Sequence, residues 1–302
     1  MSQWNFPRNL IKGNFKALEA LSLHTSFRIG GPAALWAEPK DTRELKKILL
    51  FTKRNKIPTF VIGGGTNVLA GDKGFNGIVI HLGSSSFKKA QVKGATVKVG
   101  AGYATPALVR LCCIKGLSGL ESLVGIPGTV GGAVYMNAGG WSSPLYRNIG
   151  DYITSLKVMD YNGNIKVLKK EKIEFGYRKS NLSRYVIIEA ELKLGREDCS
   201  ALRSRCSRFL QIKREKQVLD MPSAGCVFKN PKDFQFTTGQ MIDTLGLKGR
   251  RIGGAEVSKR HANFIINRNR ATSEDVMKLI GIVNKKVMES YKIPLELEIK
   301  VI

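Results

Sequence analysis

The stretch that decides the fold is Gly125-Ile-Pro-Gly-Thr-Val-Gly-Gly-Ala-Val-Tyr-Met-Asn-Ala-Gly139. Glycine has no Cβ, so it accepts backbone angles and close backbone approaches that other residues resist. A solvated loop rarely needs so many special backbone angles in one place. We therefore expect the backbone here to pack closely around a flat or phosphorylated ligand.

A second glycine run lies upstream, in Val61-Ile-Gly-Gly-Gly-Thr-Asn-Val-Leu69. It follows a predicted buried strand, Thr59-Phe-Val-Ile62, and such a loop can point backbone N–H groups at phosphate oxygens. It has neither the GxGxxG of a dinucleotide fold nor the Lys-Ser/Thr of a Walker loop. Taken alone, the run indicates either a tight turn or a phosphate site.

The remaining patterns predict an α+β protein. A capping box, Asp41 to Glu44, opens a helix that runs to about Asn55. Asn162-Gly163 predicts a hairpin between two strands. Further predicted elements include helices over 105–115, 199–216 and 273–291, strands over 77–82, 96–99 and 186–192, and a final strand over 295–301. The polar stretch at 195–198 places a domain boundary there, which divides the chain into 1–195 and 196–302.

The composition is that of a globular protein with a core. The 302 residues are 43% hydrophobic and 24% charged, and no apolar run reaches the ~18 residues of a membrane helix. Met1 to Asn5 lack the pattern of a secretion signal, so a cytoplasmic protein without membrane insertion is expected. The net charge of +25 fits nucleic acid, phosphorylated ligands or simply a solvated basic surface, and the charge alone does not separate these. The basic residues are dispersed and form no nucleic-acid-binding motif, which argues against nucleic acid.

Five cysteines occur: Cys112, Cys113, Cys199, Cys206 and Cys226. The count is odd and no pair has CxxC spacing, so neither a disulfide framework nor a metal site is predicted. The first four are expected to be buried, reduced, small apolar residues.

Together with Thr25-Ser-Phe-Arg-Ile-Gly-Gly31, the two glycine runs resemble the UDP-N-acetylenolpyruvoylglucosamine reductase family. The resemblance extends over roughly residues 20–302, in family order. Its further motifs are Tyr177-Arg-Lys-Ser180, Pro222-Ser-Ala-Gly-Cys-Val-Phe-Lys-Asn-Pro231, Gly253 to Asn267, and Leu295-Glu-Leu-Glu-Ile299.

The resemblance implies an FAD-binding domain of the vanillyl-alcohol-oxidase type, the PCMH type, followed by a smaller α+β substrate domain. The glycine loops suit the FAD pyrophosphate for the backbone reason given above. The residues that the resemblance places at FAD are Arg28, Gly63, Gly64, Gly65, Thr66, Asn67, Gly125, Gly128, Thr129 and Gly132.

The family reaction implies that NADPH reduces FAD, and that reduced FAD then delivers hydride to the enolpyruvyl group of UDP-N-acetylglucosamine enolpyruvate. The product is UDP-N-acetylmuramate, a peptidoglycan precursor. By resemblance, Arg178 stabilises charge on the substrate carboxylate, Cys226 donates a proton where many members carry serine, and Glu298 polarises the carboxylate or relays a proton. Glu296 is two residues from Glu298 on the predicted strand, so sequence alone could confuse the two.

The resemblance also assigns substrate contacts to Tyr177, Lys216 and Asn230. The proline usual two residues after the lysine is Val218 here, which weakens the match at Lys216. Only 47 residues lead from Arg178 to Cys226, too few for the inserted tyrosine loop of one family type. The chain therefore resembles the second, loop-lacking type.

Two other functions stay open from the residues alone. A flavin oxidase of the same fold would pass electrons to oxygen, but it does not explain Arg178, Cys226 and Glu298 together. A non-catalytic nucleic-acid binder rests only on the net charge. The sequence does not give the oligomeric state, for which a monomer is the expectation, and the reductase requires that the three catalytic side chains converge.

Overall fold

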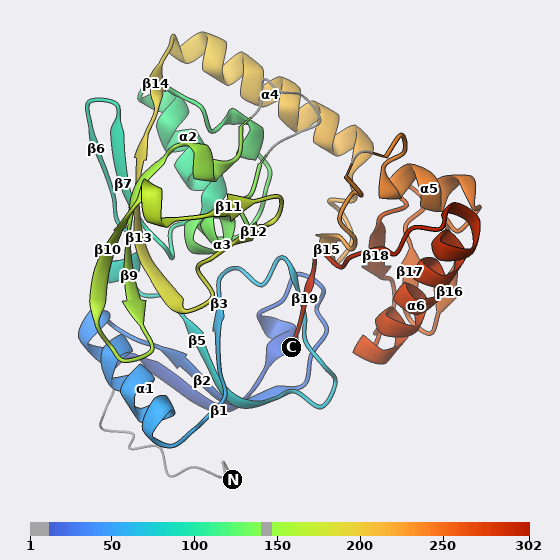
Figure 1. Cartoon of the computed structure of the whole chain (residues 1–302), viewed down its shortest axis with the longest axis horizontal. Helices are drawn as coiled ribbons and strands as arrows, with labels where there is room; N and C mark the ends of the chain where they lie inside the picture. Colours follow the sequence, from blue (N-terminus) through green and yellow to red (C-terminus); the bar gives the residue numbers. More distant parts are fainter. Residues whose placement is uncertain (1–11, 140–146, 233) are drawn as a thin grey trace. The chain divides into compact units, whose positions relative to one another are not determined.

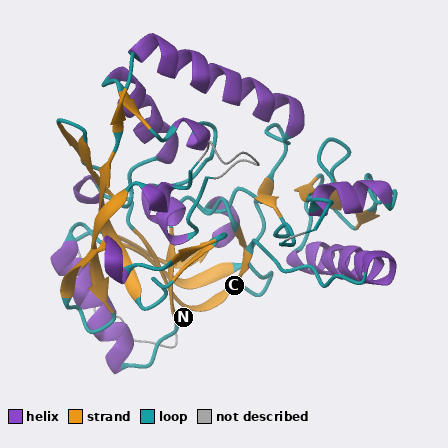
Figure 2. Cartoon of the chain, turned by 45° about the horizontal axis from the view of Figure 1, so that its top comes forward, coloured by secondary structure: helices purple, strands orange, loops and turns teal. Residues whose placement is uncertain are grey.

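The computed structural model describes residues 12–139, 147–232 and 234–302. These residues form two compact units (Figure 1). Unit 1 contains residues 12–17, 35–64 and 77–212, and unit 2 contains residues 18–34, 65–76 and 213–302. Both units combine helices with strands (Figure 2), which confirms the α+β class. Met1 to Asn5, where the sequence predicts no secretion signal, lie outside the described residues.

The main sheet of unit 1 has five strands in the order β10-β9-β13-β7-β6, and each neighbouring pair is antiparallel. The predicted hairpin at Asn162-Gly163 joins β9 to β10, and Gly163 has the positive φ that such a turn favours. The strands are β6 (Ala90–Lys93), β7 (Thr96–Gly100), β9 (Ile153–Asp160), β10 (Ile165–Lys169) and β13 (Tyr185–Lys193).

A second sheet has the order β1-β2-β5-β3, with β3 parallel to β5. Two short pairs complete this part of the fold, β11 with β12 and β8 with β14. The strands are β1 (Asn14–Ala20), β2 (Pro32–Glu38), β3 (Thr59–Ile62), β5 (Phe75–His81), β8 (Leu117–Ser118), β11 (Phe175–Gly176), β12 (Lys179–Ser180) and β14 (Gly195–Arg196).

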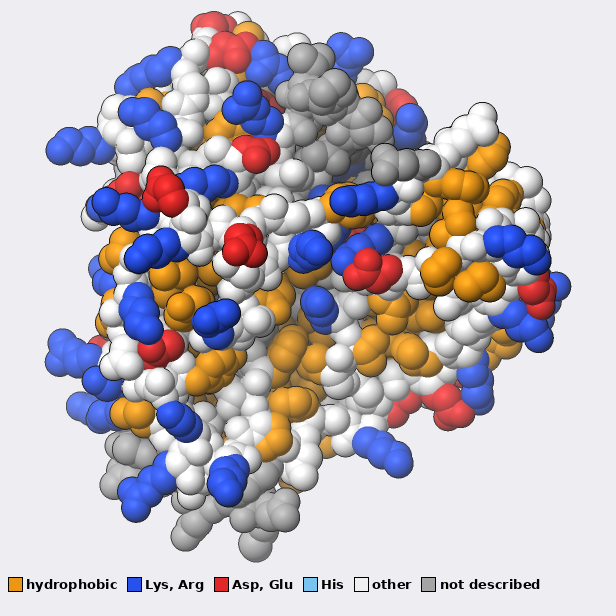
Figure 3. Space-filling view, viewed as in Figure 1, with side chains coloured by type: hydrophobic (Ala, Val, Ile, Leu, Met, Phe, Trp, Pro, Cys, Tyr) orange, Lys and Arg blue, Asp and Glu red, His pale blue; other side chains and the backbone are white. Residues whose placement is uncertain are grey.

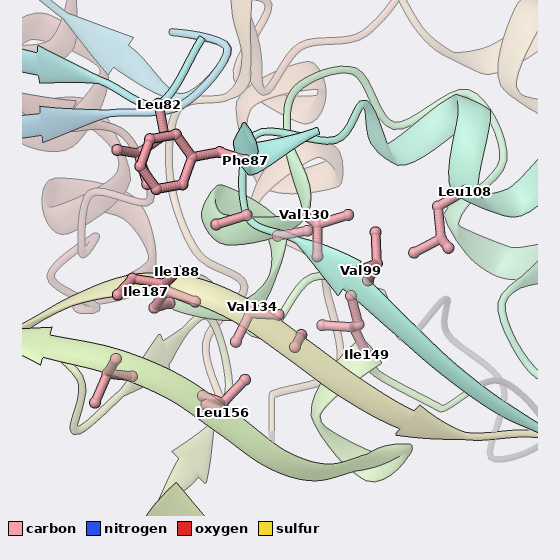
Figure 4. Packing of buried hydrophobic residues seen from close by; sticks show 14 of the residues in the cluster. Leu82, Phe87, Val99, Leu108, Val130, Val134, Ile149, Leu156, Ile187 and Ile188 are labelled. Atoms are coloured by element: carbon pink, nitrogen blue, oxygen red, sulfur yellow. The ribbon is translucent and has the colours of Figure 1, made fainter. Parts of the chain in front are cut away.

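The helices in this part of the chain are α1 (Thr42–Arg54), α2 (Thr105–Ile114), α3 (Val130–Tyr135) and α4 (Cys199–Lys216). The predicted helix over 199–216 is therefore confirmed. Figure 4 shows Val130 and Val134 of α3 packed among side chains that include Val99 of β7 and Leu156 of β9. All four side chains are fully buried, so the short helix that follows the glycine-rich motif is anchored in the core.

The start of α1 confirms half of the predicted capping box. The carboxylate of Asp41 accepts hydrogen bonds from the backbone N–H groups of Arg43 (2.8 Å) and Glu44 (3.0 Å). Glu44 does not return the bond to Asp41. Its buried carboxylate instead accepts from the backbone of Lys12 (2.7 Å), Gly13 and Lys40. A buried carboxylate needs several donors, and these segments supply them.

Unit 2 is built on an antiparallel sheet in the order β15-β18-β17-β16. Its apolar core combines one side of α6 with Phe27, which comes from a distant part of the sequence and is fully buried. The elements are β4 (Val68–Leu69), β15 (Ser223–Cys226), α5 (Thr238–Thr244), β16 (Arg251–Ile252), β17 (Ala255–Val257), β18 (Phe264–Asn267), α6 (Ser273–Tyr291) and β19 (Lys300–Val301).

The predicted strand over 295–301 is wrong in extent, because only Lys300–Val301 forms a strand, β19. The reason is a change of partner. The backbone of Glu296 and Glu298 bonds to residues 227–229, whereas Lys300 and Ile302 bond to Asn67 and Leu69. A segment that changes partner midway cannot form one continuous ladder.

The five cysteines are free thiols. Cys112, Cys113 and Cys206 are buried as expected, whereas Cys199 is half-exposed. The sulfur atoms of Cys113 and Cys206 lie 3.3 Å apart between α2 and α4. Burial raises the pKa of Cys112 to about 12.

Among the described residues, no helix combines the length and apolar character that a membrane span requires.

Asp72 joins the segment 65–76 to the start of α6. Its carboxylate accepts from Ser273 N–H (2.8 Å), Ser273 Oγ (2.7 Å) and Glu274 N–H (3.2 Å). Burial alone would raise the pKa of Asp72, but the hydrogen bonds from Ser273 and Glu274 outweigh it and lower the pKa. A lowered carboxyl pKa adds stability that is present above the unfolded-state pKa and lost as pH falls through the folded-state pKa.

We predict that Asp72→Ala lowers the free energy of unfolding by about 1 kcal/mol, the usual value of a helix cap, at pH above about 4. Below the folded-state pKa the difference from the wild type should disappear, because the carboxyl is then protonated in both states. Urea unfolding at several pH values measures this. Lys73→Ala, a change at the next exposed residue, is the control, and a pH-independent loss in Asp72→Ala would contradict the explanation.

Candidate active site

The start of the upstream glycine run, Gly63 and Gly64, packs against the glycine-rich motif in unit 1. A Cβ added to Gly64 would lie 2.6 Å from the Cα of Gly128, and one added to Gly63 would lie 2.5 Å from Thr129 Oγ1. Real Cβ atoms do not approach other atoms this closely, so the contact requires glycine at Gly64. The structure therefore brings together the segments 63–64 and 128–132, which sequence analysis assigned to one ligand.

The turn after Gly128 leads directly into α3. Thr129 is the N-cap of α3, and its Oγ1 accepts from the N–H of Gly132 at 3.4 Å. Gly125 and Gly128 both have positive φ, which glycine adopts without strain. The facing loops thus form a cradle of bare backbone, the arrangement that suits a ligand with a pyrophosphate and a flat ring. In this respect the residues fit FAD.

Four other residues predicted at the cofactor lie in unit 2: Arg28, Gly65, Thr66 and Asn67. Gly65 packs on the segment before Arg28, because its added Cβ would lie 1.9 Å from the carbonyl oxygen of His24. The Ser26 N–H donates to the Gly65 carbonyl at 3.1 Å. The Asn67 side chain donates to the Glu298 carbonyl at 3.0 Å. Unit 2 therefore joins these predicted FAD residues to the predicted catalytic segment at Glu298.

Arg178 lies in the two-residue turn between β11 and β12 in unit 1. Its φ is +53°, a left-handed conformation that is unfavourable for arginine. Its Nη1 donates to the Gly139 carbonyl at 2.9 Å, and its guanidinium lies 5.0 Å from the centre of the Tyr177 ring. Asn137 donates to the carbonyl of Gly176, one residue before Tyr177. The turn that carries Tyr177 and Arg178 is thus attached to the end of the glycine-rich motif.

Cys226 and Glu298 lie on neighbouring segments of unit 2. Cys226 ends β15, where it pairs with Phe264 of β18. The Glu298 N–H donates to the carbonyl of Val227, the residue after Cys226, at 2.8 Å. Two of the three predicted catalytic residues are therefore held close in the backbone, although they are 72 positions apart in the sequence. Their convergence with Arg178 stays a prediction.

The structure separates the two glutamates that the sequence could confuse. Glu296 is exposed, with 72% of its side chain accessible, and it forms an ion pair with Lys229 (2.5 Å). Glu298 is half-buried. A solvated, ion-paired carboxylate is a poor candidate for catalysis, so the geometry favours Glu298.

Of the predicted substrate residues, Lys216 is exposed at the last turn of α4. The side-chain oxygen of Asn230 accepts from the N–H of Thr238 at 3.0 Å, which ties the loop after β15 to the start of α5. Sequence reasoning missed Lys213, which is 2% exposed. Burial lowers the pKa of Lys213 to about 8. In a helix, Lys213 lies on the same side as Phe209, which is buried. This spacing is the feature of the sequence that could have predicted the burial of Lys213.

Two buried asparagines were also missed. Asn263 bonds to Phe228, and Asn267 bonds to the carbonyl of Phe27 at 3.0 Å. Nothing in a single sequence distinguishes them from surface asparagines.

In the described part of the chain, no group of three or more His, Cys, Asp or Glu side chains could hold a metal ion. Figure 3 shows Lys and Arg side chains dispersed over the face drawn, among apolar and acidic ones.

Models of known protein families match both parts of the chain. A model described as an FAD binding domain matches residues 33–169, and one described as the C-terminal domain of UDP-N-acetylenolpyruvoylglucosamine reductase matches residues 217–302. The reductase of that name from Moorella thermoacetica is 42% identical over 284 residues, which cover 94% of this chain and 91% of the relative. The one from Caldanaerobacter subterraneus subsp. tengcongensis is 37% identical over 295 residues, which cover 97% and 95%.

A solved structure resembles the whole chain. The crystal structure of UDP-N-acetylenolpyruvylglucosamine reductase from Thermus caldophilus superposes with a TM-score of 0.81 at 34% sequence identity. The superposition covers 96% of this chain and 99% of that one. The two-part fold with an FAD binding domain is therefore shared over nearly the full length.

We predict that Gly64→Ala abolishes FAD binding, because the new methyl group would force the loops at Gly64 and Gly128 apart. The variant should purify without flavin absorbance, whereas the wild type should purify with it. Gly281→Ala in α6 is the matched control, since nothing lies within 4 Å of a Cβ there. It should keep FAD and gain roughly 0.5–1 kcal/mol of stability from the better helix former. Normal flavin content in Gly64→Ala would contradict the close approach.

Proposed function

Since this chain belongs to the UDP-N-acetylenolpyruvoylglucosamine reductase family, the flavoprotein reductases of peptidoglycan-precursor synthesis, we propose that it reduces UDP-N-acetylglucosamine enolpyruvate to UDP-N-acetylmuramate. FAD is its bound cofactor and NADPH the hydride donor. The observation that carries the proposal is the close packing of Gly63 and Gly64 against Gly128 and Thr129. This cradle of backbone lies within the part of the chain that matches an FAD binding domain.

The residues proposed to hold FAD come from the two glycine-rich stretches and from the stretch that contains Arg28. Bound FAD supplies the hydride that the reduction requires. The protein must orient the substrate, stabilise charge and deliver a proton. The cofactor residues are Arg28, Gly63, Gly64, Gly65, Thr66, Asn67, Gly125, Gly128, Thr129 and Gly132.

Arg178 stabilises the negative charge that grows on the substrate carboxylate during reduction. A guanidinium can meet a carboxylate with two parallel hydrogen bonds, and such preorganised donors are strongest where charge develops. The bond to Gly139 and the contact with the Tyr177 ring restrict the motion of the side chain. Backbone strain tends to persist at functional sites, and the positive φ of Arg178 supports this role.

Cys226 donates the proton to the carbon next to the one that receives hydride. A thiol has a pKa near 8.5, so it is protonated at neutral pH yet parts with its proton far more easily than an alcohol. Glu298, whose backbone is bonded to the residue after Cys226, polarises the carboxylate or relays a proton. Tyr177, Lys216 and Asn230 contact the nucleotide-sugar.

We assign the chain to the loop-lacking second type of the family. The support is that residues 181–222 are taken up by β13 (Tyr185–Lys193), β14, α4 and short connections, which leave no long insert. As functional domains we keep 1–195 for the cofactor and 196–302 for the substrate, although the compact units interleave along the sequence. A monomeric enzyme that works in the cytoplasm completes the proposal.

The proposed reaction is tested in two halves by stopped-flow absorbance. NADPH should bleach the flavin band without oxygen, and addition of the enolpyruvyl nucleotide should restore it. Reoxidation by oxygen with peroxide release, and not by the nucleotide, would indicate an oxidase and contradict the proposal.

We predict that Cys226→Ala keeps flavin reduction by NADPH and stops reoxidation by the nucleotide, because the proton donor is missing. Cys199→Ala is the matched control, because Cys199, at the start of α4, is half-exposed as Cys226 is. Both half-reactions of Cys199→Ala should be normal. Reoxidation of Cys226→Ala at the wild-type rate would show that another group supplies the proton.

We predict that Arg178→Gly nearly abolishes reoxidation by the nucleotide while stability changes little. Glycine removes a left-handed strain of roughly 1–2 kcal/mol, whereas loss of the bond to Gly139 costs about 0.5–1.5 kcal/mol. Thermal unfolding and stopped-flow absorbance measure the two effects. Arg178→Lys keeps the charge but not the paired donors, and it should recover only part of the rate. A full rate with lysine would contradict two-point binding of the carboxylate.

A further inference from the structure

The segment after Cys226 is the centre of a small three-segment arrangement in unit 2. On one side, β15 pairs with β18 as far as Cys226 and Phe264. On the other side, Phe228 forms a bridge with Leu297. The residues between Cys226 and Phe228 therefore connect the β18 side of unit 2 to the segment that carries Glu298.

Asn263 continues the pairing where β15 ends. Its backbone carbonyl accepts from the N–H of Val227 at 2.8 Å. Its side-chain Oδ1 accepts from the N–H of Phe228 at 3.0 Å, and its Nδ2 donates to the carbonyl of Phe228 at 2.8 Å. The carboxamide thus pairs with Phe228 as the peptide group of a neighbouring strand would.

This clamp is buried, since Asn263 is 3% exposed and Phe228 is 2% exposed. No solvent replaces a bond that is lost at such a place, so both backbone groups of Phe228 depend on one side chain. Of the common side chains of this size, a carboxamide alone offers an acceptor and an uncharged donor at the required spacing.

The same short segment sets the place of Glu298. Val227 accepts from the Glu298 N–H at 2.8 Å, and Lys229 N–H donates to the Glu296 carbonyl at 2.8 Å. If the segment shifts relative to Asn263, the bonds from Val227 and Lys229 to the segment of Glu298 are strained or broken, and the separation of Cys226 from Glu298 changes. Errors of this kind are costly, because a displacement of about 1 Å in a reacting group can lower a rate by on the order of 10²-fold.

We propose that Asn263 is a positioning residue, whose buried carboxamide sets the register of Cys226 against Glu298 and so controls the proton-delivery half of the reaction. The inference rests on the proposed function. Asn263 does not touch the reacting atoms in this account. It acts through the backbone of Val227 and Phe228, and hydride entry from NADPH does not depend on it.

The test compares the two half-reactions of the FAD-loaded full chain. In Asn263→Ala, flavin reduction by NADPH should keep the wild-type rate, whereas reoxidation by the enolpyruvyl nucleotide should slow by roughly 10- to 100-fold. The solvent isotope effect on reoxidation should rise, because proton delivery becomes more rate-limiting. Asn263→Ser, whose hydroxyl can bond to one group of Phe228, should retain more of the rate than alanine and covers the case in which Asn263→Ala does not fold.

Thr272→Ala provides the matched control for lost stability. Thr272 caps α6 in the same unit and accepts from Asp275 N–H at 3.0 Å. Removal of this cap should lower the melting temperature by a few degrees and leave the ratio of the two half-reaction rates unchanged. If Asn263→Ala or Asn263→Ser slowed both half-reactions equally, slowed neither, or matched Thr272→Ala in that ratio, the positioning role would be wrong. A wild-type protein that the nucleotide does not reoxidise would instead reject the proposed function.

Discussion

Three buried asparagines, Asn137, Asn263 and Asn267, each bond through the carboxamide to the backbone of a distant segment. A loop can enter the interior only if its backbone N–H and C=O groups find partners. These side chains supply such partners next to the turn of Arg178, next to Cys226, and beside Arg28. The irregular segments that carry the proposed chemistry depend on this interaction, because none of them is part of a long strand or helix.

The same constraint explains how the chain tolerates strain at two arginines. Arg28 and Arg178 both have a positive φ, which glycine or asparagine adopts more readily. Such a conformation persists when the neighbouring contacts over-determine it. The bonds of Ser26 to Gly65 and of Arg178 to Gly139 are contacts of this kind. The backbone cost at each arginine is thus offset by bonds in its neighbourhood, and at Arg178 the bond to Gly139 also restricts the position of the cation.

Much of the fold was predictable because its signals are local. The capping residue Asp41, the hairpin at Asn162-Gly163 and the long helices α4 and α6 each depend on neighbours within a few positions. The final strand was overestimated, because whether residues 295–299 continue a ladder depends on which distant segment they meet. The carboxylate of Glu44 likewise accepts from the backbone of Lys12 and Gly13 and does not form the reciprocal capping bond. Its partners lie far away in the sequence, so the local pattern could not predict them.

By itself, the sequence determined the glycine runs, their spacing and the family to which they belong, because backbone freedom is a property of the residue type. It also identified Arg178, Cys226 and Glu298 as candidates through that family. Only the tertiary structure decided that Gly64 packs on Gly128, that Glu296 pairs with Lys229, and that Asn263 holds the segment after Cys226. These contacts join residues that are 35 or more positions apart, and the partner of a side chain across such a distance is fixed by packing and burial rather than by its neighbours in the chain.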